Sequence, residues 1–178
     1  AEKVIQLGGT VLTLSDSSGY IYDKSGINQE KLSHIMGLKN KRRARVNIYL
    51  KKYPKAKFFE NKKPWDIPCD IALPCATQNE LDEKDADLLI KNSCRCVGEG
   101  ANMPSSPKAI NKFTLHKILY APGKACNAGG VAVSGLEMAQ NSLRYNWTRE
   151  QVDDKLKSIM ADIHQSCIDY GKEKNYVN

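Results

Sequence analysis

The stretch Cys69-Asp-Ile-Ala-Leu-Pro74 indicates the fold class, because it is a short apolar strand that a proline ends. Two similar runs follow it at residues 94–98 and 117–120, and the segments between them, residues 84–92 and 107–114, have helical patterns. Short apolar strands that alternate with helices are typical of an α/β fold. The sequence therefore predicts a mostly parallel sheet with helices on both faces.

The residues upstream of this stretch extend the same pattern. Residues 3–8 resemble the end of a helix, and residues 10–14 form an apolar, β-branched strand. Tyr20–Tyr22 is expected to be a short strand. Asn28 is a good N-cap for a helix that runs to about Tyr53.

The residues downstream are expected to be mainly helical. One helix should begin after Asn127 and run to about Tyr145. A second should open at Thr148, where Gln151 completes a capping box. The expected packing face of this second helix has a regular helical spacing and comprises Val152, Leu156, Ile159, Met160, Ile163 and Cys167.

Composition limits the possible functions. The chain has 178 residues and a formal net charge of +7, which fits one compact domain with a local basic patch between Lys39 and Lys63. No apolar run is long enough to cross a bilayer, and the residues after Ala1 do not form a signal peptide. Residues 51–68 should be a basic connection. We expect no membrane partner, while a nucleic-acid partner for the basic patch is a minor alternative.

The six cysteines are expected to be reduced thiols that pack as small apolar side chains. Cys94 and Cys96 share one face of a strand, but a zinc site needs a second such pair at a workable spacing. We therefore predict no metal site.

Small, polar and turn-forming residues follow the strands at Ser15, Pro74, Glu99 and Ala121. Ligands of open α/β sheets gather at the carboxyl ends of the strands. We therefore expect these four loops to converge on one crevice.

The coenzyme signals in the first of these loops oppose each other. An acid such as Asp16 at a strand end commonly holds the ribose hydroxyls of NAD. Lys39, Arg42 and Arg45 follow at spacings of three and could instead neutralise the 2′-phosphate of NADP. Charge alone leaves the coenzyme open.

The segment Asn127-Ala-Gly-Gly-Val-Ala-Val-Ser134 places an amide, an apolar side chain and a hydroxyl on one stripe if it is helical. Asn127, Val131 and Ser134 are the three members. They could meet a nicotinamide ring and an acidic substrate, although a glycine-rich helix start with a satisfied serine is the simpler alternative.

Five segments closely resemble the hexameric glutamate dehydrogenases of bacteria and lower eukaryotes, in order and nearly end to end. They are Leu12–Gly19, Asp70–Leu81, Gly98–Pro104, Ala121–Asn141 and Trp147–Asn178. The resemblance implies a Rossmann-type coenzyme domain over residues 1–178. It also implies interconversion of L-glutamate with 2-oxoglutarate and ammonia.

The resemblance implies a set of coenzyme-binding and substrate-binding residues. For the coenzyme they are Ser15, Asp16, Lys39, Arg42, Ala76, Thr77, Gln78, Asn102 and Asn127, and for the substrate they are Ser134 and Val131. The first loop with Lys39 and Arg42 is more similar to NADP-using members, so we expect NADP, with NAD as the alternative.

The resemblance also implies what this chain lacks. The family's first strand, glycine-rich turn and substrate domain, with its catalytic lysine and aspartate, are expected upstream of Ala1, so no catalytic residue is assigned and the chain should not be active alone. The full protein is expected to be a cytoplasmic homohexamer, or one in an organelle matrix. A leucine or phenylalanine dehydrogenase and a non-catalytic dinucleotide-binding module are the alternatives.

Overall fold

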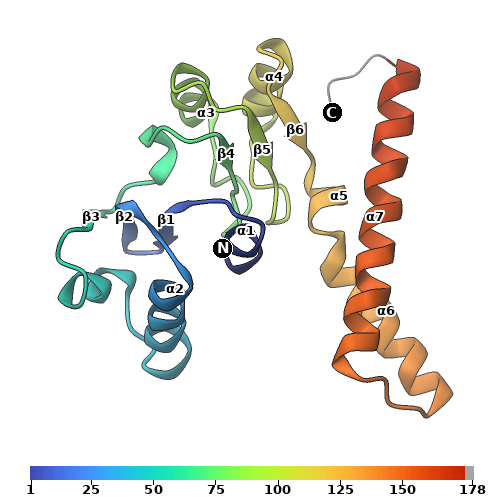
Figure 1. The fold of residues 1–178 in the computed structure, drawn as a ribbon. Helices are drawn as coiled ribbons and strands as arrows, with labels where there is room; N and C mark the ends of the chain where they lie inside the picture. The colour runs from blue at the N-terminus through green and yellow to red at the C-terminus, as the bar shows by residue number, and fades with distance from the viewer. Residues whose placement is uncertain (175–178) are drawn as a thin grey trace. The chain divides into compact units, whose positions relative to one another are not determined.

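The computed structural model describes residues 1–174 and contains two compact units (Figure 1). The N-terminal unit is Ala1–Ile67, and the C-terminal unit begins at Pro68. The last four residues of the segment Trp147–Asn178 lie outside the described residues. Each unit has its own sheet, and we describe the two separately.

The sheet of the N-terminal unit has three antiparallel strands in the order β1-β2-β3: β1 (Val11–Asp16), β2 (Gly19–Ile27) and β3 (Lys57–Glu60). Gly19 opens β2 with a φ of +136°, and a Cβ at this position would lie 2.1 Å from the carbonyl oxygen of Phe59. Only glycine fits this close approach of two strands. The Tyr20 and Phe59 rings stack with centroids 4.8 Å apart across the same pair of strands.

Helical segments accompany this sheet, and Asn28 caps one of them as predicted. Its side chain accepts a hydrogen bond of 3.0 Å from the backbone N–H of Lys31. The segments are α1 (Glu2–Gln6), α2 (Gln29–Met36), a π-helical turn (Gly37–Lys41) and two 3₁₀ helices (Val46–Lys51 and Pro64–Asp66).

The prediction of one continuous helix from Asn28 to about Tyr53 was wrong, because α2 ends at Met36. The helical backbone continues through Gly37 as the π-helical turn to Lys41, and the chain then adopts a left-handed conformation at Arg43, with φ +53°. The carboxylate of Asp16 binds both Lys39 and the backbone N–H of Val46, so this segment turns back to the end of β1. A tertiary contact overrides the local helical preference here.

The core of the N-terminal unit lies between its sheet and the helical segments. Its buried apolar side chains are Ile21, Ile27, Leu32, Ile35, Leu38, Val46, Tyr49 and Ala56. A buried carboxylate, Asp23, is satisfied among them by Lys31 at 2.8 Å, by the Tyr49 hydroxyl at 2.8 Å and by the hydroxyl and N–H of Ser25 at 2.6 and 3.0 Å.

The sheet of the C-terminal unit has three parallel strands in the order β4-β5-β6: β4 (Ile71–Ala72), β5 (Cys96–Gly98) and β6 (Leu119–Ala121). In the register, Ala72, Val97 and Tyr120 form one row, and all three side chains are buried. The neighbouring row contains Ile71 and Leu119, which are 57% and 53% exposed. The interior of this unit therefore lies on one face of the sheet.

Helices connect these strands and continue beyond them. α3 (Glu83–Lys91) follows β4, and α4 (Pro107–Leu115) follows β5; the two helices pack against each other. α5 (Gly123–Cys126), α6 (Ala128–Leu143) and α7 (Arg149–Lys174) follow β6, and α7 packs on both α5 and α6 (Figure 1).

Two features of α7 agree with the sequence. Thr148 and Gln151 exchange the expected capping-box hydrogen bonds, at 2.9 and 3.3 Å. The six expected packing side chains are all half-buried. Leu156 and Met160 lie 3.8 Å from the position that a Cβ on Gly129 of α6 would take, which is an ordinary van der Waals distance, so this face of α7 packs on α6 at Gly129.

The α/β class and the parallel strands are confirmed, but two details of the architecture differ from expectation. The described strands form two sheets of three, and the sheet of the N-terminal unit is antiparallel. The segment 51–68, expected to be a connection, contains β3. No helix among residues 1–174 has the length and apolar character needed to span a membrane.

Candidate functional site

Asp16, at the end of β1, gathers four hydrogen-bond donors around one carboxylate. The N–H and hydroxyl of Ser18 donate to Oδ1 at 2.9 and 2.6 Å. The Lys39 ammonium and the N–H of Val46 donate to Oδ2 at 2.7 and 3.1 Å. A carboxylate has about four lone-pair sites, so all of its acceptor capacity is used in this arrangement.

The electrostatics agree with this geometry. Burial alone would raise the pKa of Asp16, but the hydrogen bonds from Lys39, Ser18 and Val46 together hold it well below its usual range. The acid is therefore ionised, and in this arrangement it binds the protein's own cation and amides rather than ribose hydroxyls.

Two further side chains join this cluster. The Arg45 guanidinium donates to the hydroxyl of Ser17, next to Asp16. Sequence reasoning placed Arg45 in the basic series but did not assign it to the site, and it did not select Ser17. The spacing of three between Arg42 and Arg45 suggested that both cations lie on one helix face. The helix ends before Arg45, however, and Arg45 is the one that reaches the loop after β1.

The remaining predicted residues of the N-terminal unit are less engaged. Ser15 is exposed on β1, one residue before Asp16, and the Arg42 side chain is exposed at the end of the π-helical turn. The structure thus brings Asp16 and Lys39 together and leaves Arg42 outside that hydrogen-bonded cluster.

The loops after β4, β5 and β6 of the C-terminal unit lie side by side, as predicted. The N–H groups of Gly100 and Ala101 donate to the carbonyl of Pro74 at 3.0 and 3.1 Å. The N–H of Asn79 donates to the carbonyl of Met103 at 2.9 Å. The loop at Ser15 belongs to the other unit, so three of the four loops are shown to be neighbours, and the single crevice expected between them stays a prediction.

The predicted coenzyme residues of these loops are accessible. Ala76, Thr77, Gln78 and Asn102 are all exposed. The N–H of Ala76 donates to the Glu80 carboxylate at 2.8 Å, which closes the turn that carries the first three. Exposed side chains on a fixed turn can meet a ligand without rearrangement of the backbone.

Glu99 is a buried carboxylate that ties two of these loops together, and sequence reasoning did not select its side chain. Its Oε1 accepts from the N–H of Ser105 at 3.2 Å, and its Oε2 accepts from the N–H of Gly123 at 2.8 Å. Burial and the hydrogen bond to Glu99 raise the pKa of Tyr120. The only sequence signal for this role was the position of the acid directly after a buried strand.

Asn127 lies at the junction of α5 and α6. Its side-chain amide donates to the carbonyl of Ala101 at 3.0 Å and does not cap α6. Its backbone N–H donates to the carbonyl of Gly123 at 2.9 Å, and the N–H of Gly130 donates to its carbonyl at 3.2 Å. These two N–H groups of the glycine-rich segment are therefore already used.

The helical stripe beyond Asn127 exists as expected. Val131 and Ser134 both lie on α6, and Val131 is 74% exposed. The hydroxyl of Ser134 is exposed and donates to the carbonyl of Gly130 at 3.3 Å. A hydroxyl with this weak local bond can still accept a hydrogen bond or exchange its partner for an anionic substrate.

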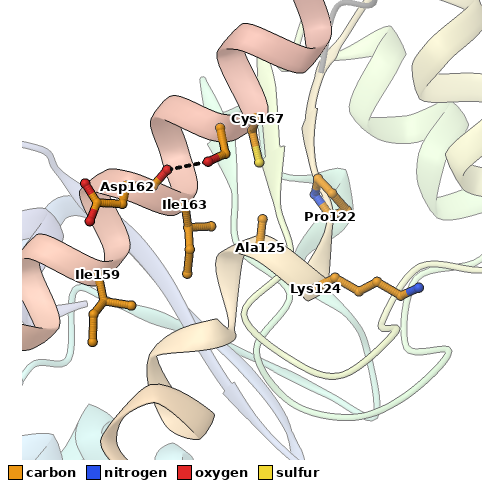
Figure 2. Close-up of a pocket in the computed structure, with 8 residues that line it drawn as sticks. Pro122, Lys124, Ala125, Ile159, Asp162, Ile163 and Cys167 are labelled. Carbon is orange, nitrogen blue, oxygen red and sulfur yellow. Dashed lines mark hydrogen bonds between the residues drawn. The ribbon is translucent and has the colours of Figure 1, made fainter.

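A cavity of about 560 Å³ lies between α5 and α7 (Figure 2). Its walls are mostly apolar and comprise Pro122, Lys124, Ala125, Ile159, Asp162, Ile163, Ser166 and Cys167. None of the predicted coenzyme or substrate residues lines it, so we do not identify it with the site formed by the three loops.

The chain is similar to known proteins in both its sequence and its fold. The family model described as "Glutamate/Leucine/Phenylalanine/Valine dehydrogenase" matches residues 1–177. The glutamate dehydrogenase of Bacteroides thetaiotaomicron is 60% identical over 178 residues, which cover 99% of this chain and 40% of that protein. The NAD(P)-specific glutamate dehydrogenase of Xylanibacter ruminicola is 56% identical, again covering 99% of this chain and 40% of the relative.

A solved structure gives the same result. The crystal structure of Plasmodium falciparum glutamate dehydrogenase superposes with a TM-score of 0.92 at 50% identity, and the match covers 97% of this chain and 37% of that one. The chain thus spans about 40% of the length of the curated relatives it matches. By its sequence and its fold, the chain belongs to the glutamate/leucine/phenylalanine/valine dehydrogenase family.

Proposed function

We propose that the chain is the coenzyme-binding part of a glutamate dehydrogenase, which interconverts L-glutamate with 2-oxoglutarate and ammonia and uses NADP. Family membership supports the reaction class. The observation that carries the proposal is the position of Asn127. Asn127 lies at the start of α6, the helix that bears Val131 and Ser134, and a hydrogen bond to the carbonyl of Ala101 fixes its side-chain amide to the neighbouring loop.

The proposed coenzyme residues lie on both units and keep the assignments expected from the sequence. In the N-terminal unit, Ser15, Asp16, Lys39 and Arg42 are proposed, and we add Ser17 and Arg45. An ammonium, a guanidinium and a hydroxyl match the acceptor oxygens of a 2′-phosphate, and a guanidinium suits phosphate particularly well. The ionised Asp16 orients the Lys39 ammonium, so the acid is compatible with NADP.

In the C-terminal unit, four exposed loop residues are proposed to contact the ribose and the nicotinamide of the coenzyme. They are Ala76, Thr77, Gln78 and Asn102. The coenzyme, when bound, supplies the hydride acceptor or donor of the reaction. Asn127 would hold the nicotinamide end through its amide, which can both accept and donate.

The proposed substrate contacts lie on α6. The exposed hydroxyl of Ser134 would donate to the side-chain carboxylate of glutamate, one turn beyond the apolar contact of Val131. The proton-transfer groups of the reaction are not assigned to this chain. We therefore propose that catalysis requires the remainder of the polypeptide.

We extend the proposal to the assembly and location of the full protein. It is a homohexamer in the cytoplasm or in an organelle matrix, with a Rossmann-type domain that includes this chain. Sedimentation of the full-length protein tests the hexamer, and fractionation of the source cells tests the location.

The test of function uses the full-length polypeptide that contains this chain. Initial rates of coenzyme reduction are measured with glutamate, leucine, phenylalanine and valine, each with NADP and with NAD. We expect glutamate with NADP to have the highest kcat/KM by at least about tenfold, which is about 1.4 kcal/mol in transition-state binding.

Each alternative has its own outcome in this matrix. A preference for NAD with glutamate would remove the coenzyme assignment and keep the reaction. A preference for leucine or phenylalanine would replace the substrate. Coenzyme binding without turnover of any of the four amino acids would favour a non-catalytic module.

A further inference from the structure

The carboxylate of Glu99 has no role in the function proposed above, yet its placement is unusual. The residue is 3% exposed and directly follows β5. Burial of a charge is costly unless hydrogen bonds replace its hydration. A buried acid at the carboxyl end of a parallel strand therefore needs an explanation beyond packing.

Its hydrogen bonds provide one, because they come from two separate segments. The N–H of Ser105 belongs to the end of the loop after β5, and the N–H of Gly123 is the first of α5. One carboxylate thus fixes the end of the loop after β5 and the start of α5 relative to each other.

The same contacts lead directly to Asn127. The carbonyl of Gly123 accepts from the N–H of Asn127 at 2.9 Å, and the Asn127 side chain returns to the carbonyl of Ala101 at 3.0 Å. Ala101 is two residues after Glu99. These bonds form a closed ring that runs from Glu99 through Gly123 and Asn127 to Ala101.

Packing within this ring is close. A Cβ built on Gly123 would lie 3.1 Å from the carbonyl oxygen of Ala101, 3.3 Å from Oε2 of Glu99 and 3.4 Å from Nδ2 of Asn127. The ring has little free space, so a change at one member is transmitted to the others.

We propose that Glu99 is a positioning residue of the enzyme: it holds Gly123, and through Gly123 it fixes the amide of Asn127 at the nicotinamide end of the site. This inference rests on the proposed function for its catalytic consequence. The geometric part, in which Glu99 places the Asn127 amide, is independent of the reaction.

The first experiment is a double-mutant cycle in the full-length polypeptide with Glu99→Gln and Asn127→Ala. Glutamine has nearly the same shape but turns an N–H toward one of the donors. We expect Glu99→Gln to lower kcat on the order of 10- to 100-fold, as expected for loss of a hydrogen bond to a charged group.

The cycle separates positioning from a general structural role. If Glu99 acts through Asn127, then Glu99→Gln should lower kcat by less than about threefold when Asn127 is already alanine. An equal loss in both backgrounds, or an unchanged kcat in the single variant, would overturn the inference. Glu83→Gln is the matched control, because Glu83 lies on α3 with ion pairs to Lys108 and Lys112, and it should keep the wild-type rate.

A second measurement does not depend on activity. In isotope-labelled protein, the side-chain amide resonances of Asn127 should shift in Glu99→Gln and stay in place in Glu83→Gln. Resonances that do not move in Glu99→Gln would refute the positioning role even if the wild-type enzyme is active. An inactive wild type with shifted resonances would refute the proposed reaction and leave the positioning role intact.

Gly123→Ala gives the same test by another route. It keeps the charge of Glu99 and forces the ring apart through an added methyl group, so it also serves if Glu99→Gln does not fold. We expect a lower kcat and shifted Asn127 resonances. A wild-type rate and unmoved resonances in Gly123→Ala would contradict the inference.

Discussion

Replacement of Asp23 by asparagine should expose how strongly one buried carboxylate stabilises the N-terminal unit. The side chain of Asp23 is only 6% exposed. Burial alone would raise the pKa of Asp23, but Lys31, Ser25 and Tyr49 lower it from 3.8 to about 2. At about 1.4 kcal/mol per pKa unit, this difference corresponds to about 2 kcal/mol of folding free energy.

The sign of the pH dependence follows from the lowered pKa. The contribution of Asp23 is fully present above pH 3.8, the ordinary pKa, and is lost as the pH falls toward about 2. Asp23→Asn should therefore reduce the free energy of unfolding by about 2 kcal/mol at pH 7. The difference between variant and wild type should close between roughly pH 4 and pH 2.

The assay is urea-induced unfolding followed by the fluorescence of Trp65, which is buried in the N-terminal unit. A Trp147→Phe background removes the signal of the tryptophan in the other unit. Glu30→Gln is the control, because the Glu30 side chain is 70% exposed and its ion pair with Lys52 should contribute little.

Two results would refute this reasoning about Asp23. One is an Asp23→Asn variant as stable as the wild type at pH 7. The other is a difference in stability between Asp23→Asn and the wild type that stays constant down to pH 2. That result would mean that the charge of Asp23 does not stabilise the unit.

Three further predictions concern the strands, the substrate and the coenzyme. Gly19→Ala should destabilise the N-terminal unit by more than about 2 kcal/mol, because φ is +136° and the added methyl group would overlap a carbonyl of β3. The control Gly37→Ala places a methyl group in open space at φ −62° and should be neutral or stabilising, and the urea midpoints of the two variants give the comparison. In the full-length enzyme, Ser134→Ala should raise KM for glutamate far more than KM for coenzyme, and steady-state kinetics with equal effects on both would contradict the substrate role. Lys39→Ala with Arg45→Ala should raise the Kd of NADP on the order of 10- to 100-fold and leave that of NAD nearly unchanged, as titration calorimetry would show.

The positions of most helices and strands were predictable because they depend on local signals. Asn28 caps α2, and Thr148 with Gln151 opens α7, because these side chains satisfy backbone groups of their own segment. β5 was predictable from its apolar run, and the start of α6 was predictable from the glycine-rich segment after Asn127.

The errors have a different physical origin. They lie where contacts between residues distant in sequence determine the secondary structure. β3 is a strand because its backbone pairs with β2, although lysines and prolines surround it in sequence. The helix after Asn28 breaks because Asp16 binds Lys39 and Val46. A sequence pattern records neither pairing.

The candidate site was predictable as a set of loops but not as a network. The carboxyl ends of parallel strands must share an edge, so the loops at Pro74, Glu99 and Ala121 could be grouped in advance. The carboxylate at the centre of the group could not be selected, because its importance depends on N–H groups of Ser105 and Gly123.

The four donors of Asp16 have a consequence for the evolution of coenzyme choice. Its Oδ2 accepts a hydrogen bond from the ammonium of Lys39, which we propose binds the phosphate, and another from the N–H of Val46, a core residue. A lineage that exchanged this acid to accept a different dinucleotide would also release a buried segment from its anchor. Such a change in selectivity would persist only with a second, stabilising substitution nearby, so the two traits should be inherited together.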